Sequence, residues 1–97
     1  MPVQLVAIIE TGEEGQSAVA DLLAGLISRI RGEDGCERYD VFTSGRSRLV
    51  LLEQWRDGSA LQQHTTAPSF VELMADLERL AVPAPTVHVL RPVAARE

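Results

Sequence analysis

The sequence predicts an α+β fold in which one antiparallel sheet carries helices on a single face. Short segments rich in β-branched and apolar residues alternate with amphipathic helical segments. Their order along the chain is strand, helix, strand, strand, two-part helix, strand. The length of 97 residues and the hydrophobic content of 45% are typical of one compact globular core rather than two.

The first predicted strand covers residues 3–10, with the sequence VQLVAIIE. β-Branched and apolar residues dominate it, and Thr11 and Gly12 close it. Apolar side chains stand at both odd and even positions. Because successive side chains of a strand point to opposite faces, we expect both faces of this strand to be covered.

The first predicted helix covers residues 16–31, where apolar residues recur at intervals of three and four. These residues form one face of the helix: Val19, Leu22, Leu23, Leu26, Ile27 and Ile30. Gly32 and Gly35 end the periodic pattern. Glu33 and Asp34 are interpreted as part of the connecting turn.

A β-hairpin is predicted next. Its first arm, residues 36–43 (CERYDVFT), contains Tyr, Val and Phe at a density typical of strands. Residues 44–47 (SGRS) are compatible with a tight turn. The second arm, residues 48–56 (RLVLLEQWR), again has apolar residues on both faces. We therefore expect both faces of this strand to be buried, as for the first strand.

The second helical part is predicted in two pieces. Residues Ser59 to Gln62 match the capping-box pattern, so a short helix is expected from Ser59 to about Thr66. Pro68 suits the first position of a further helix, which ends before Pro83. Its apolar face contains five residues: Phe70, Leu73, Met74, Leu77 and Leu80.

The last strand is predicted over residues 86–92 (TVHVLRP), and residues 93–97 are expected to fray. This gives one domain over residues 1–97 with an ordered core of about residues 3–92. The βαββαβ order is that of the ferredoxin-like fold, whose right-handed crossovers place both helical parts on one face of the sheet. The other face would expose a larger apolar patch than monomers tolerate, so we expect a homodimer through the sheet face.

Composition excludes several classes of function. The net charge of −5 and the scattered arginines argue against a nucleic-acid partner. The longest apolar stretches are far shorter than the ~20 residues of a membrane-spanning helix, so no membrane partner is expected. The N-terminus has no secretory pattern, and the lone Cys36 cannot form an internal disulfide, which indicates a cytoplasmic protein. No metal, P-loop or dinucleotide motif is present, so no cofactor is expected.

Four residues with useful chemistry remain: Tyr39 on the second strand, Glu53 and Trp55 near the end of the third, and His64 on the short helix. They lie in or beside segments with recognisable motifs. In chain order these are Gly-Cys-x-x-Tyr at 35–39, Glu-x-Trp at 53–55, Ser-Ala-Leu-x-x-His at 59–64, Pro-Ser-Phe at 68–70 and Val-x-Val-Leu-x-Pro at 87–92.

In this order, and over nearly the whole length, the chain resembles the antibiotic biosynthesis monooxygenase domain family, which includes small quinol monooxygenases. The resemblance implies a dimeric α+β barrel with a cavity between the sheet and the helices of each subunit. It also implies oxygenation of a phenolic or quinol substrate without metal, flavin or haem.

This chemistry is consistent with the four residues. A small aromatic quinol donates electrons to O₂ far better once it is deprotonated, so an apolar pocket with a base suffices. His64 is the expected base, because imidazole titrates near neutral pH. Trp55 would form a wall of the pocket, and Tyr39 would hydrogen-bond a substrate oxygen. Glu53 would orient His64 or a water molecule.

Each residue also has a structural interpretation. His64 could be an exposed residue of a polar helix, Trp55 a core residue that seals the end of a strand, and Tyr39 a packing residue. Glu53 could form an ion pair with an arginine such as Arg38 or Arg48.

The sequence offers two further candidate residues, His88 and Cys36, and two alternative functions. His88 is more typical of a core or interface histidine, and Cys36 of a small packing residue. Besides a monooxygenase, the sequence is compatible with a dimer of the same fold that binds a small ligand without turnover. It is also compatible with an isomerase or cyclase that acts on a polyketide or lactone.

Overall fold

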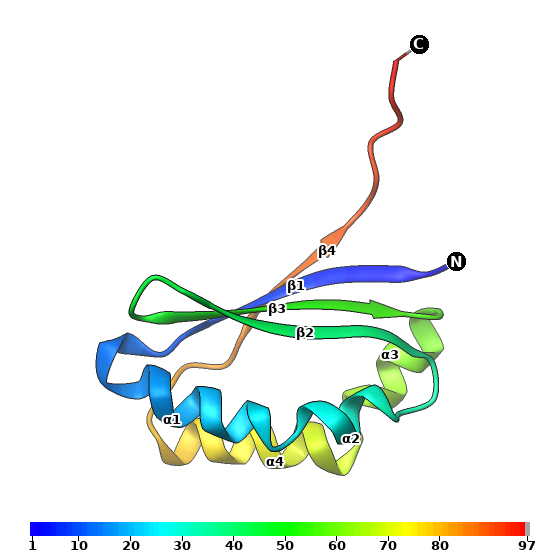
Figure 1. The fold of residues 1–97 in the computed structure, drawn as a ribbon. Coiled ribbons are helices and arrows are strands. Elements are labelled where there is room, and N and C mark those ends of the chain that lie inside the picture. The colour runs from blue at the N-terminus through cyan, green and yellow to red at the C-terminus, as the bar shows by residue number, and fades with distance from the viewer. Residues whose placement is uncertain (97) are drawn as a thin grey trace.

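The structure, a computed structural model that describes residues 1–96, is a four-stranded antiparallel sheet with every helix on one face (Figure 1). The elements in chain order are β1 (Val3–Glu10), α1 (Gly12–Ala24), α2 (Ile27–Arg31), β2 (Cys36–Ser44), β3 (Arg48–Trp55), α3 (Gly58–His64), α4 (Pro68–Arg79) and β4 (Thr86–Leu90). The strand order is β2-β3-β1-β4, with β3 and β1 in the centre. The predicted ferredoxin-like α+β fold is thereby confirmed.

The first helical segment differs from the predicted single helix over residues 16–31. It begins at Gly12, where a positive φ of 73° turns the chain out of β1, and Glu13 and Glu14 lie in the first turn. Acidic side chains stabilise this end of a helix dipole. The helix then breaks after Ala24, because the N–H of Leu26 bonds the carbonyl of Leu23, three residues back. α2 follows as a separate short helix.

The start of α3 also differs from the prediction. The N-cap is Asp57 rather than Ser59, and its carboxylate accepts a hydrogen bond of 2.9 Å from the backbone N–H of Ala60. The capping box predicted at Ser59 is therefore wrong. The helix ends at His64 instead of Thr66. The shift matters because it makes His64 the last residue of α3, beside the turn that leads to α4.

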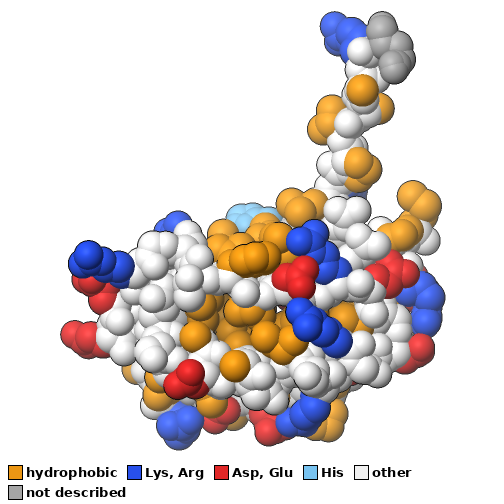
Figure 2. Space-filling view, viewed as in Figure 1, with side chains coloured by type: hydrophobic (Ala, Val, Ile, Leu, Met, Phe, Trp, Pro, Cys, Tyr) orange, Lys and Arg blue, Asp and Glu red, His pale blue; other side chains and the backbone are white. Residues whose placement is uncertain are grey.

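Within the described residues, helices cover one face of the sheet and leave the other face without a helix. On the helix face, Leu5, Ile9 and Leu49 are almost completely buried. The opposite face of β1 and β3 carries half-buried apolar residues, as the two-sided strand pattern predicted. We call this opposite side the open face; its apolar residues are Val6, Ile8, Phe42, Val50, Leu52 and Leu90. Figure 2 shows hydrophobic side chains along this helix-free upper edge of the molecule.

The C-terminal part is shorter in regular structure than predicted. β4 ends at Leu90 rather than at Pro92, and every residue of β4 is exposed. Residues 91–96 form no helix or strand and project away from the body (Figure 1). The predicted frayed tail covers residues 93–97, of which Glu97 lies outside the described residues. Among residues 1–96, no helix is both long and apolar enough to cross a bilayer.

Candidate active site

A cavity of about 170 Å³ lies between the sheet and the helical layer. Its walls are mostly apolar, with Leu5 and Leu51 from the sheet and Leu61, Phe70 and Leu73 from the helices. Four polar side chains also line it: Tyr39, Glu53, His64 and Thr65. An apolar cavity of about 150 Å³ holds one benzene molecule, so this space suits a small aromatic compound.

His64 is held at the end of α3 in a nearly buried position, with 5% of its surface exposed. Its ring stacks on Trp55, with centroids 4.4 Å apart and an interplanar angle of 27°. The ring of Phe70 meets it edge-on at 5.5 Å. His64 also lines the cavity. The alternative in which His64 is an exposed residue of a polar helix is therefore wrong.

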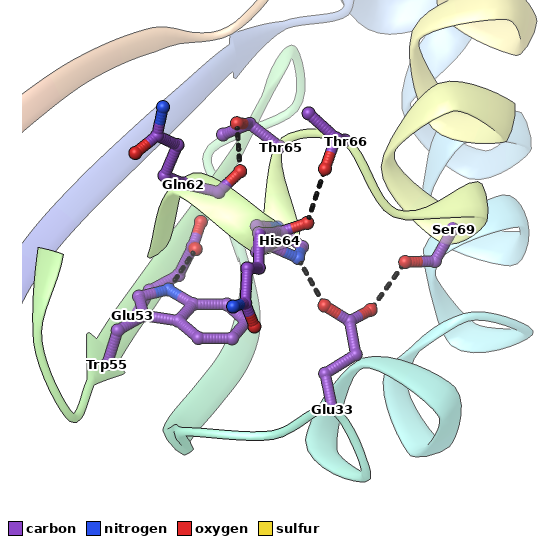
Figure 3. Close-up of polar contacts among 9 residues, drawn as sticks. Glu33, Glu53, Trp55, Gln62, His64, Thr65, Thr66 and Ser69 are labelled. Atoms are coloured by element: carbon purple, nitrogen blue, oxygen red, sulfur yellow. Dashed lines mark hydrogen bonds and ion pairs between the residues drawn. The ribbon is translucent and has the colours of Figure 1, made fainter. Parts of the chain in front are cut away.

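The polar partner of His64 is Glu33, which lies in the turn between α2 and β2. The Nδ1 atom of His64 is 2.7 Å from Oε1 of Glu33, and the hydroxyl of Ser69 donates to Oε2 of the same carboxylate at 2.6 Å (Figure 3). A carboxylate only accepts hydrogen bonds, so the neutral imidazole carries its proton on Nδ1. Among residues 1–96 no side chain bonds Nε2, which leaves this nitrogen with a free lone pair.

The sequence pattern predicts only that Glu33 lies in a connecting turn and gives no link between Glu33 and His64. Helical and strand periodicity say nothing about which turn residue points inward, and 31 residues separate the two partners. The one available signal was an acidic residue in a short glycine-bounded turn directly before a strand.

Trp55 and Glu53 form a second buried pair, in which the indole Nε1–H donates to Oε1 of Glu53 at 3.0 Å (Figure 3). Trp55 is fully buried behind the imidazole and does not line the cavity. The expectation that it forms a pocket wall is wrong, because His64 lies on it. Glu53 does line the cavity, but the carboxylate that holds His64 is that of Glu33.

The arginine pairing considered for Glu53 is also wrong. Arg38 pairs with Asp40 at 2.6 Å, and Arg48 pairs with Glu10 at 2.7 Å. Burial raises the pKa of Glu53. The bond from Trp55 and the charge on His64 oppose this shift, and the nearby Glu33 acts in the same direction as burial. Glu53 therefore keeps its proton to a higher pH than an ordinary glutamate.

Tyr39 lies directly opposite Glu53 in the antiparallel pair of β2 and β3, so both side chains share the helix face. Its ring centroid is 6.1 Å from that of His64. Burial raises the pKa of the Tyr39 phenol, and the charges of Glu53 and Glu33 act in the same direction. The phenol thus remains a hydrogen-bond donor. Within residues 1–96 its hydroxyl has no hydrogen-bond partner, which leaves it free for a ligand.

The structure therefore brings Tyr39, Glu53, Trp55 and His64 together, and it adds Glu33. The other two candidates lie elsewhere or are unsuited to chemistry. His88 is exposed on β4 and lies opposite Val6, on the open face. Burial raises the pKa of the Cys36 thiol, which disfavours the reactive thiolate. Nowhere in residues 1–96 do three or more His, Cys, Asp or Glu side chains gather so that they could hold a metal ion.

Comparison with known proteins gives a consistent result. The family model described as antibiotic biosynthesis monooxygenase matches residues 2–76. A curated protein named "Putative monooxygenase Rv0793", from Mycobacterium tuberculosis, is 33% identical over 93 residues, which is 95% of this chain and 92% of that protein.

Solved structures match over almost the whole chain. The structure of Rv0793 from Mycobacterium tuberculosis has a TM-score of 0.85 and 32% identity, and the match covers 100% of both chains. That of PA3566 from Pseudomonas aeruginosa has a TM-score of 0.85 and 27% identity, over 96% of this chain and 95% of the other. A protein from Deinococcus radiodurans has the same fold at 20% identity, with a TM-score of 0.82 and coverage of 100% and 97%.

Proposed function

The chain belongs to the antibiotic biosynthesis monooxygenase family, and we propose that it is a cofactor-independent monooxygenase that oxidises a small quinol or polyphenol with O₂. The observation that carries the proposal is the position of His64. One ring nitrogen is held by a carboxylate, and the other is free on a residue that lines an apolar cavity large enough for an aromatic ring. This is the arrangement that a general base requires.

The first step is removal of a phenolic proton by Nε2 of His64. The resulting imidazolium is stabilised by the Glu33 carboxylate at 2.7 Å and by its stacking on Trp55. The apolar walls exclude water, so these interactions act at a low effective dielectric constant. The quinolate that forms is a much stronger electron donor than the neutral quinol.

The negative charge that develops on the substrate oxygen needs a hydrogen-bond donor. The Tyr39 hydroxyl is available for this, because no other described group uses it and its raised pKa keeps it protonated. This donor would stabilise the anion more than the neutral quinol, which favours the reaction.

Oxygen then reacts with the electron-rich ring. In the balanced reaction, a quinol and O₂ give a hydroxyquinone and water. One oxygen atom replaces a ring hydrogen as a hydroxyl group, and the other leaves as water. The substrate supplies all four electrons, two in the oxidation of quinol to quinone and two in the hydroxylation of the ring.

We further propose that the working form is a homodimer through the open face. Support comes from Val6, Ile8, Val50 and Leu52, which are only half-buried because no helix covers this side. Phe42 extends the patch with 49% of its surface exposed. Two open faces packed together would remove this apolar surface from water.

The function is tested by incubating the pure protein with hydroquinone, menadiol and anthrone under air. Quinone formation and O₂ uptake are measured above the autoxidation blank. Wild type should exceed the blank with at least one substrate, His64→Ala should not, and Gln63→Ala, an exposed neighbour on α3, should behave as wild type.

Two other outcomes would replace the proposal. Saturable binding of these compounds with no turnover above the blank would indicate a ligand-binding dimer. Turnover of a polyketide or lactone without O₂ would indicate an isomerase or cyclase.

A further inference from the structure

We propose that Glu33 is the positioning residue of this site: it holds His64 in the tautomer that leaves Nε2 free, and Ser69 holds Glu33 in place. The inference rests on the proposed function, in which Nε2 takes the substrate proton. It adds two residues, Glu33 from the turn before β2 and Ser69 from the first turn of α4, which no sequence motif links to the chemistry.

Among residues 1–96, each oxygen of the Glu33 carboxylate has one hydrogen-bond partner. Oε1 is 2.7 Å from Nδ1 of His64, and Oε2 accepts from the Ser69 hydroxyl at 2.6 Å (Figure 3). Both distances are in the range of hydrogen bonds to an ionised acceptor. The two contacts fix the carboxylate in position and direction, and through it the plane and the tautomer of the imidazole.

No arginine competes for this carboxylate among the ion pairs of residues 1–96. Arg29 is nearby but pairs with Glu72 at 2.7 Å, and Arg56 pairs with Asp34 at 3.1 Å. The ion-pair partner of Glu33 is therefore His64. Ser69 is itself buried, with 3% of its surface exposed, so the hydroxyl is committed to this contact.

Glu33 does not line the cavity that we assign to the substrate. It lines a separate open hollow together with Ser28, Arg29, Gly32 and Pro68, and 20% of its side chain is exposed. It can therefore not touch the substrate, and its hydrogen bond to the residues that line the cavity is the one to His64. The same exposure means that a small carboxylate from solvent can take its place when the side chain is removed.

The direct test is the tautomer of His64, measured by long-range ¹H–¹⁵N correlation on the ¹⁵N-labelled protein at a pH at which the imidazole is neutral. Wild type should show a protonated Nδ1 and an unprotonated Nε2. Glu33→Ala should show loss of this single tautomer, and Ser69→Ala a smaller change in the same direction. Asp34→Asn, next to Glu33 but paired with Arg56, should match wild type.

The second test is kinetic. Glu33→Ala should lower kcat by about 10- to 100-fold, the scale known for loss of the carboxylate that orients a metal-bound histidine, with little change in KM. Added formate should restore part of the rate to Glu33→Ala and none to His64→Ala, whereas loss of the fold would not respond to formate. Circular dichroism checks that each variant is folded.

The outcomes separate this inference from the proposed function. If wild type does not turn over quinols but Glu33→Ala changes the tautomer, the function is wrong and the positioning role stands. If wild type turns over and Glu33→Ala has the wild-type tautomer and rate, the positioning role is wrong and the function stands. A folded Ser69→Ala variant with a wild-type spectrum would remove Ser69 from the account.

Discussion

The imidazole of His64 lies flat against the indole of Trp55, with ring centroids 4.4 Å apart, while the same indole donates its only N–H to Glu53. Trp55 therefore contacts two of the titratable side chains that line the cavity, His64 and Glu53, without reaching the cavity itself. Its role is to support the site rather than to contact a ligand.

Trp55→Phe should destabilise the protein by about 3 kcal/mol. The smaller ring leaves a void in a fully buried site, and Glu53 loses its buried hydrogen-bond donor, which alone costs about 1–3 kcal/mol. Urea unfolding followed by circular dichroism measures this, because Trp55 is the only tryptophan and the variant has no indole fluorescence. A loss below about 0.5 kcal/mol would contradict the support role.

Tyr39→Phe, in contrast to Trp55→Phe, should lower activity and leave stability almost unchanged. The hydroxyl has no partner within residues 1–96, so its removal should change the free energy of unfolding by less than about 0.5 kcal/mol. If the hydroxyl donates to the substrate, kcat/KM should fall about tenfold, the equivalent of one hydrogen bond. Equal activity of variant and wild type on the best substrate would remove Tyr39 from the site.

Glu53→Gln should stabilise the protein in a pH-dependent way. Burial raises the pKa of Glu53 above its usual value of 4.5, so the unfolded chain loses this proton at a lower pH than the folded chain. At neutral pH the folded chain must either bury the charge of Glu53 or take up a proton, and both cost stability. The cost disappears as the pH falls below 4.5.

The thermal midpoint of Glu53→Gln should accordingly exceed that of wild type at pH 7, and the difference should vanish near pH 4. Glu78→Gln, in which an exposed glutamate is changed, serves as the control with no such difference. A variant that is less stable than wild type at pH 7 would contradict the argument.

The open face gives a prediction about assembly. Wild type should sediment at about twice the chain mass of 10.6 kDa at micromolar concentration. Leu52→Glu, which places a charge in the middle of the open face, should give monomers. Val71→Glu, at a position on α4 that is 57% exposed, should leave the dimer intact. A monomeric wild type would contradict the proposed interface.

Most of the fold could be predicted because strands and helices leave periodic patterns. β1 matches its predicted bounds of residues 3–10, and both arms of the hairpin agree within one residue. The predictions fail at helix ends, where a single local hydrogen bond determines the residue at which a helix begins or ends. Asp57, not Ser59, accepts from the amide of Ala60, and the bond from Leu26 to Leu23 ends α1 early. Such bonds depend on the backbone path and not on residue type alone.

The site was predictable only in part, for a related reason. Tyr39, Glu53 and His64 are chemically conspicuous, and the strand register brings the first two together. The sequence predicts that Glu53 orients His64 or a water molecule, whereas in the structure the carboxylate bonded to His64 is that of Glu33, from a turn. Turns carry no periodicity, so the direction of a turn side chain follows from tertiary packing, here the approach of α4 with Ser69.

The central claim is that His64 activates a small quinol for insertion of one oxygen atom from O₂. Turnover under ¹⁸O₂ followed by mass spectrometry of the product tests it most directly. We predict that wild type places a single ¹⁸O atom in the hydroxyquinone, and that His64→Ala gives no labelled product above the blank. An unlabelled quinone from wild type, or equal labelling by His64→Ala, would contradict the account.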